Sequence, residues 1–266
     1  MLFGLGSKKR KEPEARLSTD GRLIYAIGDV HGRLDLLEDL LRRIVDDIAA
    51  SKPAQKPVLI FLGDYIDRGA FSKGVIDCAI KLKALGDIEV RALKGNHEQS
   101  LLSFLTDPQV GPGWFQHGGA ATLVSYGVPA PQTHNATEIW EQASEAFNKV
   151  LPAAHLKFYQ DLEIKAEYGD YIFVHAGLRP GVPIEQQTEQ DMLWIRAEFL
   201  EERRPFGKVV VHGHSPEPEP TLNKVRLGLD TGAYATGILT AARLFDGECS
   251  FIQATAHGDP LVAKAS

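Results

Sequence analysis

Cysteine is scarce in this sequence, and only Cys78 and Cys249 occur among its 266 residues. The two do not form a CxxC pair, and neither has a histidine at metal-ligand spacing. The sequence therefore does not indicate a disulfide framework or a cysteine-based zinc site. Both are interpreted as ordinary thiols in a reducing compartment, so the expected location of the protein is the cytoplasm.

Long apolar runs and an excess of basic residues are also missing. No run reaches the roughly 18–20 apolar residues that would span a bilayer. At the N-terminus, the basic cluster at residues 8–11 follows a short apolar stretch, which is the reverse of the order in a secretory signal. The formal net charge is −6, and no nucleic-acid partner is expected for a chain without a basic excess.

The sequence does contain enough apolar residues, 44% of the total, to bury a full core. Its length and pattern predict a flexible N-terminal tail at residues 1–20 and a single domain at residues 21–266. A helical insertion is expected around residues 107–160. Within it, residues 107–119 are predicted to form a loop, and residues 137–159 to form helices, broken at Pro152, that lie over the sheet as a lid.

Strand-like and helical patterns alternate through the first half of the chain, and strands dominate the second half. Strands are predicted at residues 22–27, 57–62, 88–93, 162–167, 171–175, 208–212, 225–230 and 238–245, with the fourth and fifth forming a hairpin. Helices are predicted at residues 34–50, 75–85, 98–105 and 189–201. The expected fold class is α/β, with two packed mixed β-sheets flanked by helices in four layers.

Five short polar segments follow the predicted strands, and each combines a glycine with a carboxylate, an amide or an imidazole. They are GDVHG at residues 28–32, GDYIDRG at 63–69, GNHE at 95–98, HAG at 175–177 and HGHS at 212–215. In open α/β sheets, ligands bind beyond the carboxyl ends of the strands. The five segments are therefore expected to converge on one site.

Six side chains of these segments are candidate metal ligands, namely Asp29, His31, Asp64, Asn96, His175 and His214. Two carboxylates, one amide oxygen and three imidazoles suit Mn, Fe, Zn, Co or Ni better than Ca or Mg. In a two-metal hydrolase, one carboxylate bridges cations about 3.5–4 Å apart. Asp64 is the natural bridge because it ends the central strand of the first three.

The five segments, in this order and spacing, resemble the signature of the calcineurin-like metallophosphoesterases. More narrowly, they resemble bacterial and phage members of the phosphoprotein phosphatase family. Pro216 stands where many members of the wider superfamily carry a further histidine, which favours this branch. The resemblance implies the metallophosphoesterase fold and two divalent metal ions, expected to be Mn²⁺, with Fe, Zn, Co or Ni as alternatives. It assigns the ligands of the two ions as Asp29, His31 and Asp64, and as Asp64, Asn96, His175 and His214.

The resemblance also implies roles for four further residues. His97 is expected to be the general acid for the leaving group, and Asp67 to pair with its other ring nitrogen. Arg68 and Arg196 are expected to bind the phosphoryl oxygens. A hydroxide bridging the two metals is the expected nucleophile. His212, in contrast, is interpreted as a packed histidine and not as a ligand.

Three functions remain open at this point. The favoured one is hydrolysis of phosphoserine and phosphothreonine monoesters in proteins. The second is hydrolysis of a nucleotide such as diadenosine tetraphosphate, and Glu98 after His97 argues against its symmetrical form, in which aspartate is expected there. The third is a scaffold that binds metal or phosphate without turnover. The expected partner is accordingly a phosphoprotein or a phosphorylated small molecule, and the oligomeric state is open.

Overall fold

The computed structural model describes residues 17–131, 137–256 and 262–264. Most of the predicted N-terminal tail lies outside these ranges. Its last residues, however, are held by the turn at residues 169–170. The backbone N–H of Ser18 donates to Asp170 Oδ2 at 2.6 Å, and Gly169 N–H donates to Asp20 Oδ2 at 2.8 Å. The part of the chain that is attached to the domain therefore begins before residue 21.

The first sheet has the strand order β11-β10-β9-β1-β2-β3. Its strands are β1 (Ile24–Ile27), β2 (Val58–Phe61), β3 (Glu89–Ala92), β9 (Ile238–Phe245), β10 (Glu248–Thr255) and β11 (Val262–Lys264). Strands β1, β2 and β3 are parallel, because the helices α1 (Leu34–Ser51) and α2 (Ser72–Leu85) return the chain to the same edge. Strand β9 runs antiparallel to β1.

Strands β10 and β11 are not predicted from the sequence. Strands β9 and β10 form a hairpin in which Phe245 pairs with Glu248. Its turn is Asp246-Gly247, with φ of 48° and 79°. Asp-Gly is a preferred pair for tight hairpin turns that need positive φ at both positions. This dipeptide was therefore the available signal for β10.

The second sheet has the strand order β4-β5-β6-β8-β7. Its strands are β4 (Lys165–Tyr168), β5 (Tyr171–Val174), β6 (Val209–His212), β7 (Thr221–Leu222) and β8 (Arg226–Gly228). The predicted hairpin is confirmed, since β4 and β5 are antiparallel with Tyr168 opposite Tyr171. Strand β6 is parallel to both β5 and β8, so the carboxyl ends of β5 and β6 lie at one edge.

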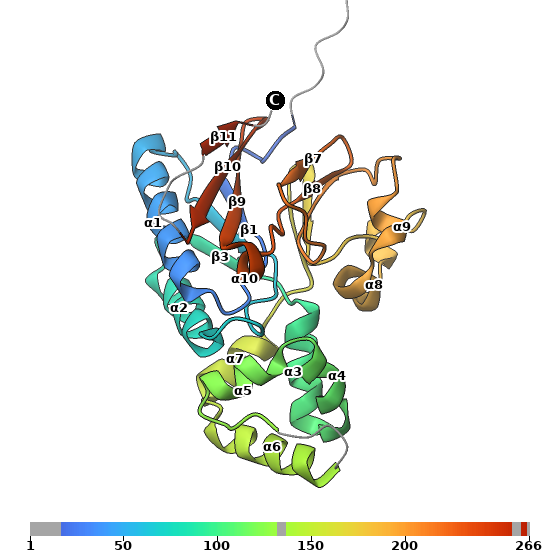
Figure 1. Ribbon diagram of the computed structural model, residues 1–266. Coiled ribbons are helices and arrows are strands. Elements are labelled where there is room, and N and C mark those ends of the chain that lie inside the picture. The colour runs from blue at the N-terminus through green and yellow to red at the C-terminus, as the bar shows by residue number, and fades with distance from the viewer. Residues whose placement is uncertain (1–16, 132–136, 257–261, 265–266) are drawn as a thin grey trace, which may run out of the picture.

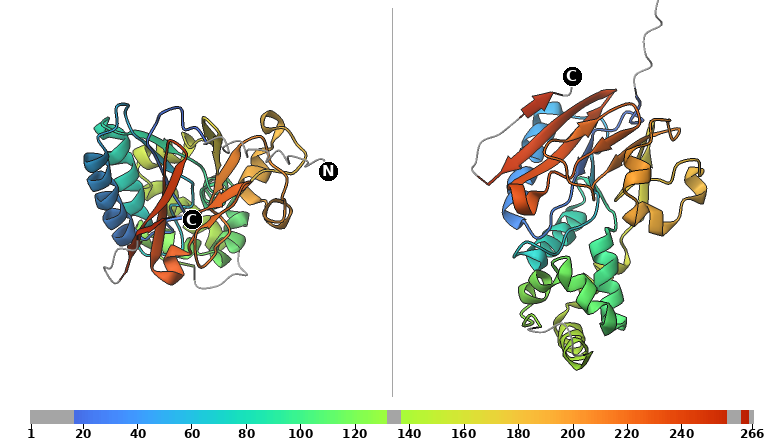
Figure 2. Two further views of the ribbon diagram at one scale, coloured as in Figure 1. Left: turned by 90° about the horizontal axis from the view of Figure 1, so that it is seen from above. Right: turned by 45° about the vertical axis from the view of Figure 1, so that its right-hand side comes forward.

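Alternation of side chains along the strands produces the predicted four layers. In β1, Ile24 and Ala26 face the second sheet and pack with Phe173 and Val211. Tyr25, on the opposite face, packs with α1 and α2. The outer face of the second sheet packs against the short helices α8 (Glu189–Trp194) and α9 (Ala197–Leu200). Figure 2 shows these layers, with helices outside and the two sheets between them.

A group of helices follows β3. It comprises α3 (Asn96–Thr106), η1 (Pro108–Val110), α4 (Gly111–Gln116), α5 (Gly119–Ser125), α6 (Thr137–Val150) and α7 (Ala153–Gln160). The predicted loop at residues 107–119 is wrong, because η1 and α4 occupy most of it. Pro108 and Pro112 lie in the first turns of these helices, where proline is tolerated.

These helices lie together at one end of the molecule, not over a face of a sheet as a lid (Figure 1). Trp114, Phe147 and Phe158 from this group share one buried cluster with Tyr25 and Leu59 of the first sheet. The helices are thus part of the main core. Among the described residues, no helix combines the length and hydropathy needed to cross a bilayer.

The core between the sheets generates a stability prediction. Phe173 is fully buried there, and its replacement by alanine leaves a cavity. We expect Phe173→Ala to lower the free energy of unfolding by about 3–5 kcal/mol, measured by denaturant titration. Leu222→Ala, at a position that is 42% exposed, is the control and should change it by less than about 0.5 kcal/mol. Similar losses in both variants would contradict this packing.

Candidate metal centre

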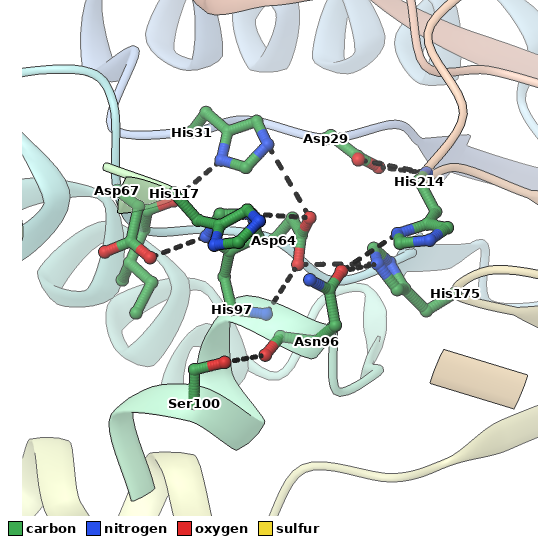
Figure 3. Close-up of polar contacts among 12 residues, drawn as sticks. Asp29, His31, Asp64, Asp67, Asn96, His97, Ser100, His117, His175 and His214 are labelled. Carbon is green, nitrogen blue, oxygen red and sulfur yellow. Dashed lines mark hydrogen bonds and ion pairs between the residues drawn. The ribbon is translucent and has the colours of Figure 1, made fainter. Parts of the chain in front are cut away.

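The five polar segments meet at one edge of the sandwich, as the strand order requires. Asp29 and His31 follow β1, Asp64 follows β2, and Asn96 begins α3 just after β3. From the second sheet, His175 follows β5 and His214 follows β6. All six candidate ligands are at most 5% exposed. Figure 3 shows their side chains pointing toward one another around Asp64.

Asp64 is the centre of this arrangement. Its Oδ2 lies 3.6 Å from His31 Nε2 and 3.7 Å from His97 Nε2, and its Oδ1 lies 3.4 Å from His175 Nε2. Asn96 Oδ1 lies 2.9 Å from both His175 Nε2 and His214 Nδ1. Two overlapping clusters of donor atoms share Asp64, one with His31 and His97 and the other with His175 and His214. A carboxylate common to both is what a bridging ligand requires.

Hydrogen bonds on the far side of the rings determine which nitrogens face inward. His31 Nδ1 lies 2.8 Å from the carbonyl oxygen of Ile66, and His175 Nδ1 lies 2.9 Å from that of Leu62. A carbonyl only accepts, so each Nδ1 carries the proton and each Nε2 presents a lone pair. This fixed tautomer is typical of histidines that bind metals.

The atoms that face inward are nitrogens and oxygens with lone pairs, which can bind cations. Burial lowers the pKa of His31 to about 3, so its ring is neutral and its Nε2 lone pair faces a carboxylate. Burial, with the charges of Asp230 and Asp64, raises the pKa of Asp29. His214 Nε2 is buried without a hydrogen-bond partner among the described residues. These residues fit divalent cations, which favour neutral imidazole and ionised carboxylate together.

The backbone is strained at several residues of the site. Eight non-glycine residues in the described ranges have positive φ, and five of them are His31, Asp64, Asp67, Arg68 and His214. Such conformations cost of order 1–3 kcal/mol each and persist where surrounding contacts enforce them. These turns therefore place the side chains of the site at a cost in local backbone stability.

Glycine allows the two sheets to approach closely at this edge. A Cβ on Gly213 would lie 2.0 Å from Asp29 Oδ1, so only glycine fits between the β6 turn and this carboxylate. The neighbouring N–H of His214 donates to Asp29 Oδ2 at 3.0 Å. The HGHS segment thus brings a histidine of the second sheet to an aspartate of the first.

His97 and Asp67 form the predicted pair beside the ligands. His97 Nδ1 lies 2.6 Å from Asp67 Oδ2, and both side chains are buried. Burial alone would lower the pKa of His97, but the charges of Asp64 and Asp67 and the hydrogen bond to Asp67 outweigh it and raise it to about 9. The hydrogen bond to the buried Asp67 carboxylate favours the protonated ring, which is the form that a general acid needs.

Glu98 holds the loops after β2 and β3 together, a role that is not predicted from the sequence. Its Oε2 accepts the backbone N–H groups of Asp64 and Gly95, and its Oε1 accepts that of Tyr65, each at 2.9 Å. The side chain is fully buried and does not line the pocket over the site. Glu98 therefore contacts backbone and not substrate, so it carries no preference between protein and nucleotide substrates.

A pocket of about 270 Å³ opens over the candidate ligands. Arg68, Arg196 and Tyr234 line it. The guanidinium of Arg68 lies over the ring of Tyr234, with 4.4 Å from Cζ to the ring centroid, and Arg196 donates to Ser215 Oγ at 3.4 Å. Both predicted phosphate-binding arginines are thus within this pocket. The sequence analysis misses His117, which also lines it and belongs to no motif.

Neither His212 nor Arg33, which follows the GDVHG segment, lines the pocket. His212 is buried, with Nδ1 2.9 Å from Gly213 O and its ring edge-on to Phe199, so it is packed as predicted. Arg33 pairs with Asp35 at 2.6 Å and does not line the pocket.

Comparisons with known proteins agree with this geometry. The family model for calcineurin-like phosphoesterases matches residues 22–239. The chain is 25% identical over 254 residues to the asymmetrical bis(5'-nucleosyl)-tetraphosphatase PrpE of Anoxybacillus flavithermus, covering 88% of this chain and 95% of that protein. It is 27% identical over 231 residues to serine/threonine-protein phosphatase 1 of Salmonella typhimurium, covering 84% and 92%.

Solved structures share the fold. The crystal structure of a putative diadenosine tetraphosphatase superposes with a TM-score of 0.58 at 19% identity, covering 95% of this chain and 97% of that one. A cold-active protein-tyrosine phosphatase of a Shewanella species gives 0.58 at 15% identity, covering 94% and 82%. The family model over residues 22–239 and the phosphatases of similar sequence identify the chain as a member of the calcineurin-like phosphoesterase family and as a metal-dependent phosphoric ester hydrolase.

Proposed function

We propose that this enzyme is a phosphoprotein phosphatase that hydrolyses phosphoserine and phosphothreonine monoesters. The observation that carries the proposal is the distribution of cations around the site. Among the described residues, two arginines, Arg68 and Arg196, and no lysine line the pocket over the candidate ligands. Two guanidinium groups suit one phosphoryl group, whereas a tetraphosphate chain would need further cations for its other phosphates.

An adjoining groove supports the same substrate class. It is lined by side chains of α3, η1, α4 and α8, and it shares His117 and Trp194 with the site pocket. In the described part of the chain, neither lysine nor arginine lines this groove. Amide, hydroxyl and indole groups such as Gln99, Ser100 and Trp194 suit a polypeptide next to the phosphorylated residue better than a polyphosphate chain.

The proposed metal ligands are the six candidate side chains, and Asp64 is proposed to bridge the two ions. We expect Mn²⁺, and the mixed nitrogen and oxygen donors suit Fe, Zn, Co or Ni as well. When bound, two divalent cations lower the pKa of a water molecule and neutralise charge on the phosphoryl group.

The remaining steps belong to the protein's own groups. Arg68 and Arg196 bind the equatorial phosphoryl oxygens, and the stacking of Arg68 on Tyr234 holds its guanidinium in the pocket. His97 donates the proton on Nε2 to the leaving oxygen of the serine or threonine. Asp67 keeps the other nitrogen of His97 protonated and fixes the ring.

Hydrolysis of diadenosine tetraphosphate is the second candidate. Its support is the similarity to PrpE, which extends over 95% of that protein. Glu98 does not weigh against it, since that side chain is occupied by backbone N–H groups.

The ligand set generates the first prediction here. Asp64→Ala removes the bridging carboxylate, and we expect turnover to fall by at least about a hundredfold, because metal-ion catalysis is worth several kcal/mol. Metal content per chain, measured by elemental analysis, should fall as well. His212→Asn is the control, because His212 is the buried first residue of the HGHS segment and its hydrogen-bond partners are Gly213 O and Arg226. Full metal content in Asp64→Ala would contradict the assignment.

The acid role of His97 generates the second prediction. His97→Asn should lower turnover on alkyl phosphates by about 10²–10⁴-fold, with metal content intact. The loss should be much smaller on p-nitrophenyl phosphate, because its leaving group needs little protonation. Steady-state kinetics on both esters provide the measurement. Equal losses on the two would show that His97 does not act as the acid.

A direct competition of substrates tests the proposed class. At one fixed Mn²⁺ concentration, we expect kcat/KM for a phosphothreonine peptide to exceed that for diadenosine tetraphosphate. Arg196→Ala provides the internal comparison and should lower the rate on either substrate, since it binds the shared phosphoryl group. A higher kcat/KM on the dinucleotide would replace the proposal by the second candidate, and no turnover of any phosphate ester would favour a non-catalytic scaffold.

A further inference from the structure

The Asp67 carboxylate has two partners besides His97. Its Oδ2 accepts the indole N–H of Trp114 at 2.7 Å, and its Oδ1 accepts the hydroxyl of Thr122 at 2.5 Å. Trp114 lies in α4 and Thr122 in α5. The carboxylate that orients His97 is therefore itself held by two helices that follow it in the chain by 47 and 55 residues.

These two contacts fix the carboxylate plane. A carboxylate with a hydrogen bond on each oxygen cannot rotate without breaking one of them. The backbone N–H of Asp67 also donates to Ser72 Oγ at 3.0 Å and to Thr122 Oγ1 at 2.9 Å. Asp67 has a φ of 72°, a conformation that persists only where contacts enforce it.

Trp114 is itself locked in place. It is 3% exposed, and its ring packs against Phe104 with centroids 5.0 Å apart. A Cβ on Gly119 would lie 2.5 Å from the indole, so the glycine makes room for it. The N–H of Trp114 consequently points at Asp67 without freedom to turn away.

From this geometry we infer that Trp114 and Thr122 are positioning residues for protonation of the leaving group. They hold Asp67 at the angle at which its Oδ2 accepts the Nδ1 proton of His97, so that Nε2 faces the leaving oxygen. The helices after α3 thus support the acid of the reaction. This inference rests on the proposed acid role of His97 and deepens it.

The experiment compares leaving groups. Trp114→Phe keeps an aromatic ring and removes the N–H, and Thr122→Val keeps the shape and removes the hydroxyl. Loss of one hydrogen bond to a charged group is expected to lower turnover of phenyl phosphate and of a phosphoserine peptide by about tenfold or more. Turnover of p-nitrophenyl phosphate should fall by less than about threefold.

Phe147→Leu is the control, since Phe147 packs near Trp114, with ring centroids 6.4 Å apart, and is not a hydrogen-bond partner of Asp67. It should change all leaving groups alike. Should Trp114→Phe fail to fold, as judged by circular dichroism, Thr122→Val decides the outcome. In the Asp67→Asn background, Trp114→Phe should add no further selectivity for leaving groups, because it acts through Asp67.

A loss that is uniform across leaving groups in both Trp114→Phe and Thr122→Val would overturn this inference. So would a selective loss that persists undiminished on top of Asp67→Asn. Either result leaves the proposed function intact as long as the wild-type enzyme hydrolyses these esters. Absence of turnover in the wild-type enzyme would instead overturn the proposed function itself.

Discussion

The crowding of lone pairs around the Asp64 carboxylate is the constraint on which the rest of the site depends. Imidazole nitrogens, an amide oxygen and carboxylate oxygens of buried side chains lie within a few ångströms of one another. Such atoms repel one another unless positive charge lies between them. The fold imposes this unfavourable geometry through five residues with left-handed backbone conformations and through Glu98, which ties three backbone N–H groups together. The packing of the two sheets thus offsets the local cost of strain and repulsion in the free energy of folding.

Separate elements of the fold carry the different groups of the site. The strand ends position candidate ligands, α3 carries His97, and α4 and α5 fix the carboxylate behind it. The arginines come from different sheets' loops and face the same pocket. The two helices that hold Asp67 therefore lie outside the predicted lid at residues 137–159, and Trp114 and Leu123 bury them in the main core.

Much of this arrangement is predictable from the sequence, because it follows from short-range patterns. Buried strands ending in Gly-Asp or Gly-His segments predict both the sheet edge and the convergence of the six side chains. What is missed depends on tertiary contacts. The indole N–H of Trp114 and the hydroxyl of Thr122 reach Asp67 across dozens of residues, and no periodicity marks them. Helix α4 is missed because its glycines and prolines resemble a loop, and β10 is missed although Asp246-Gly247 marks its hairpin.

The origin of the donor atoms in both sheets has a thermodynamic consequence. Asp29, Asp64 and Asn96 belong to the first sheet's loops, whereas His175 and His214 belong to the second's. Cations held between these groups would cross-link the two sheets in the folded chain and not in the unfolded one. By mass action, the thermal stability of the protein would then rise with the concentration of free divalent ion. A chelator would lower it by removing the ions from the interface between the sheets.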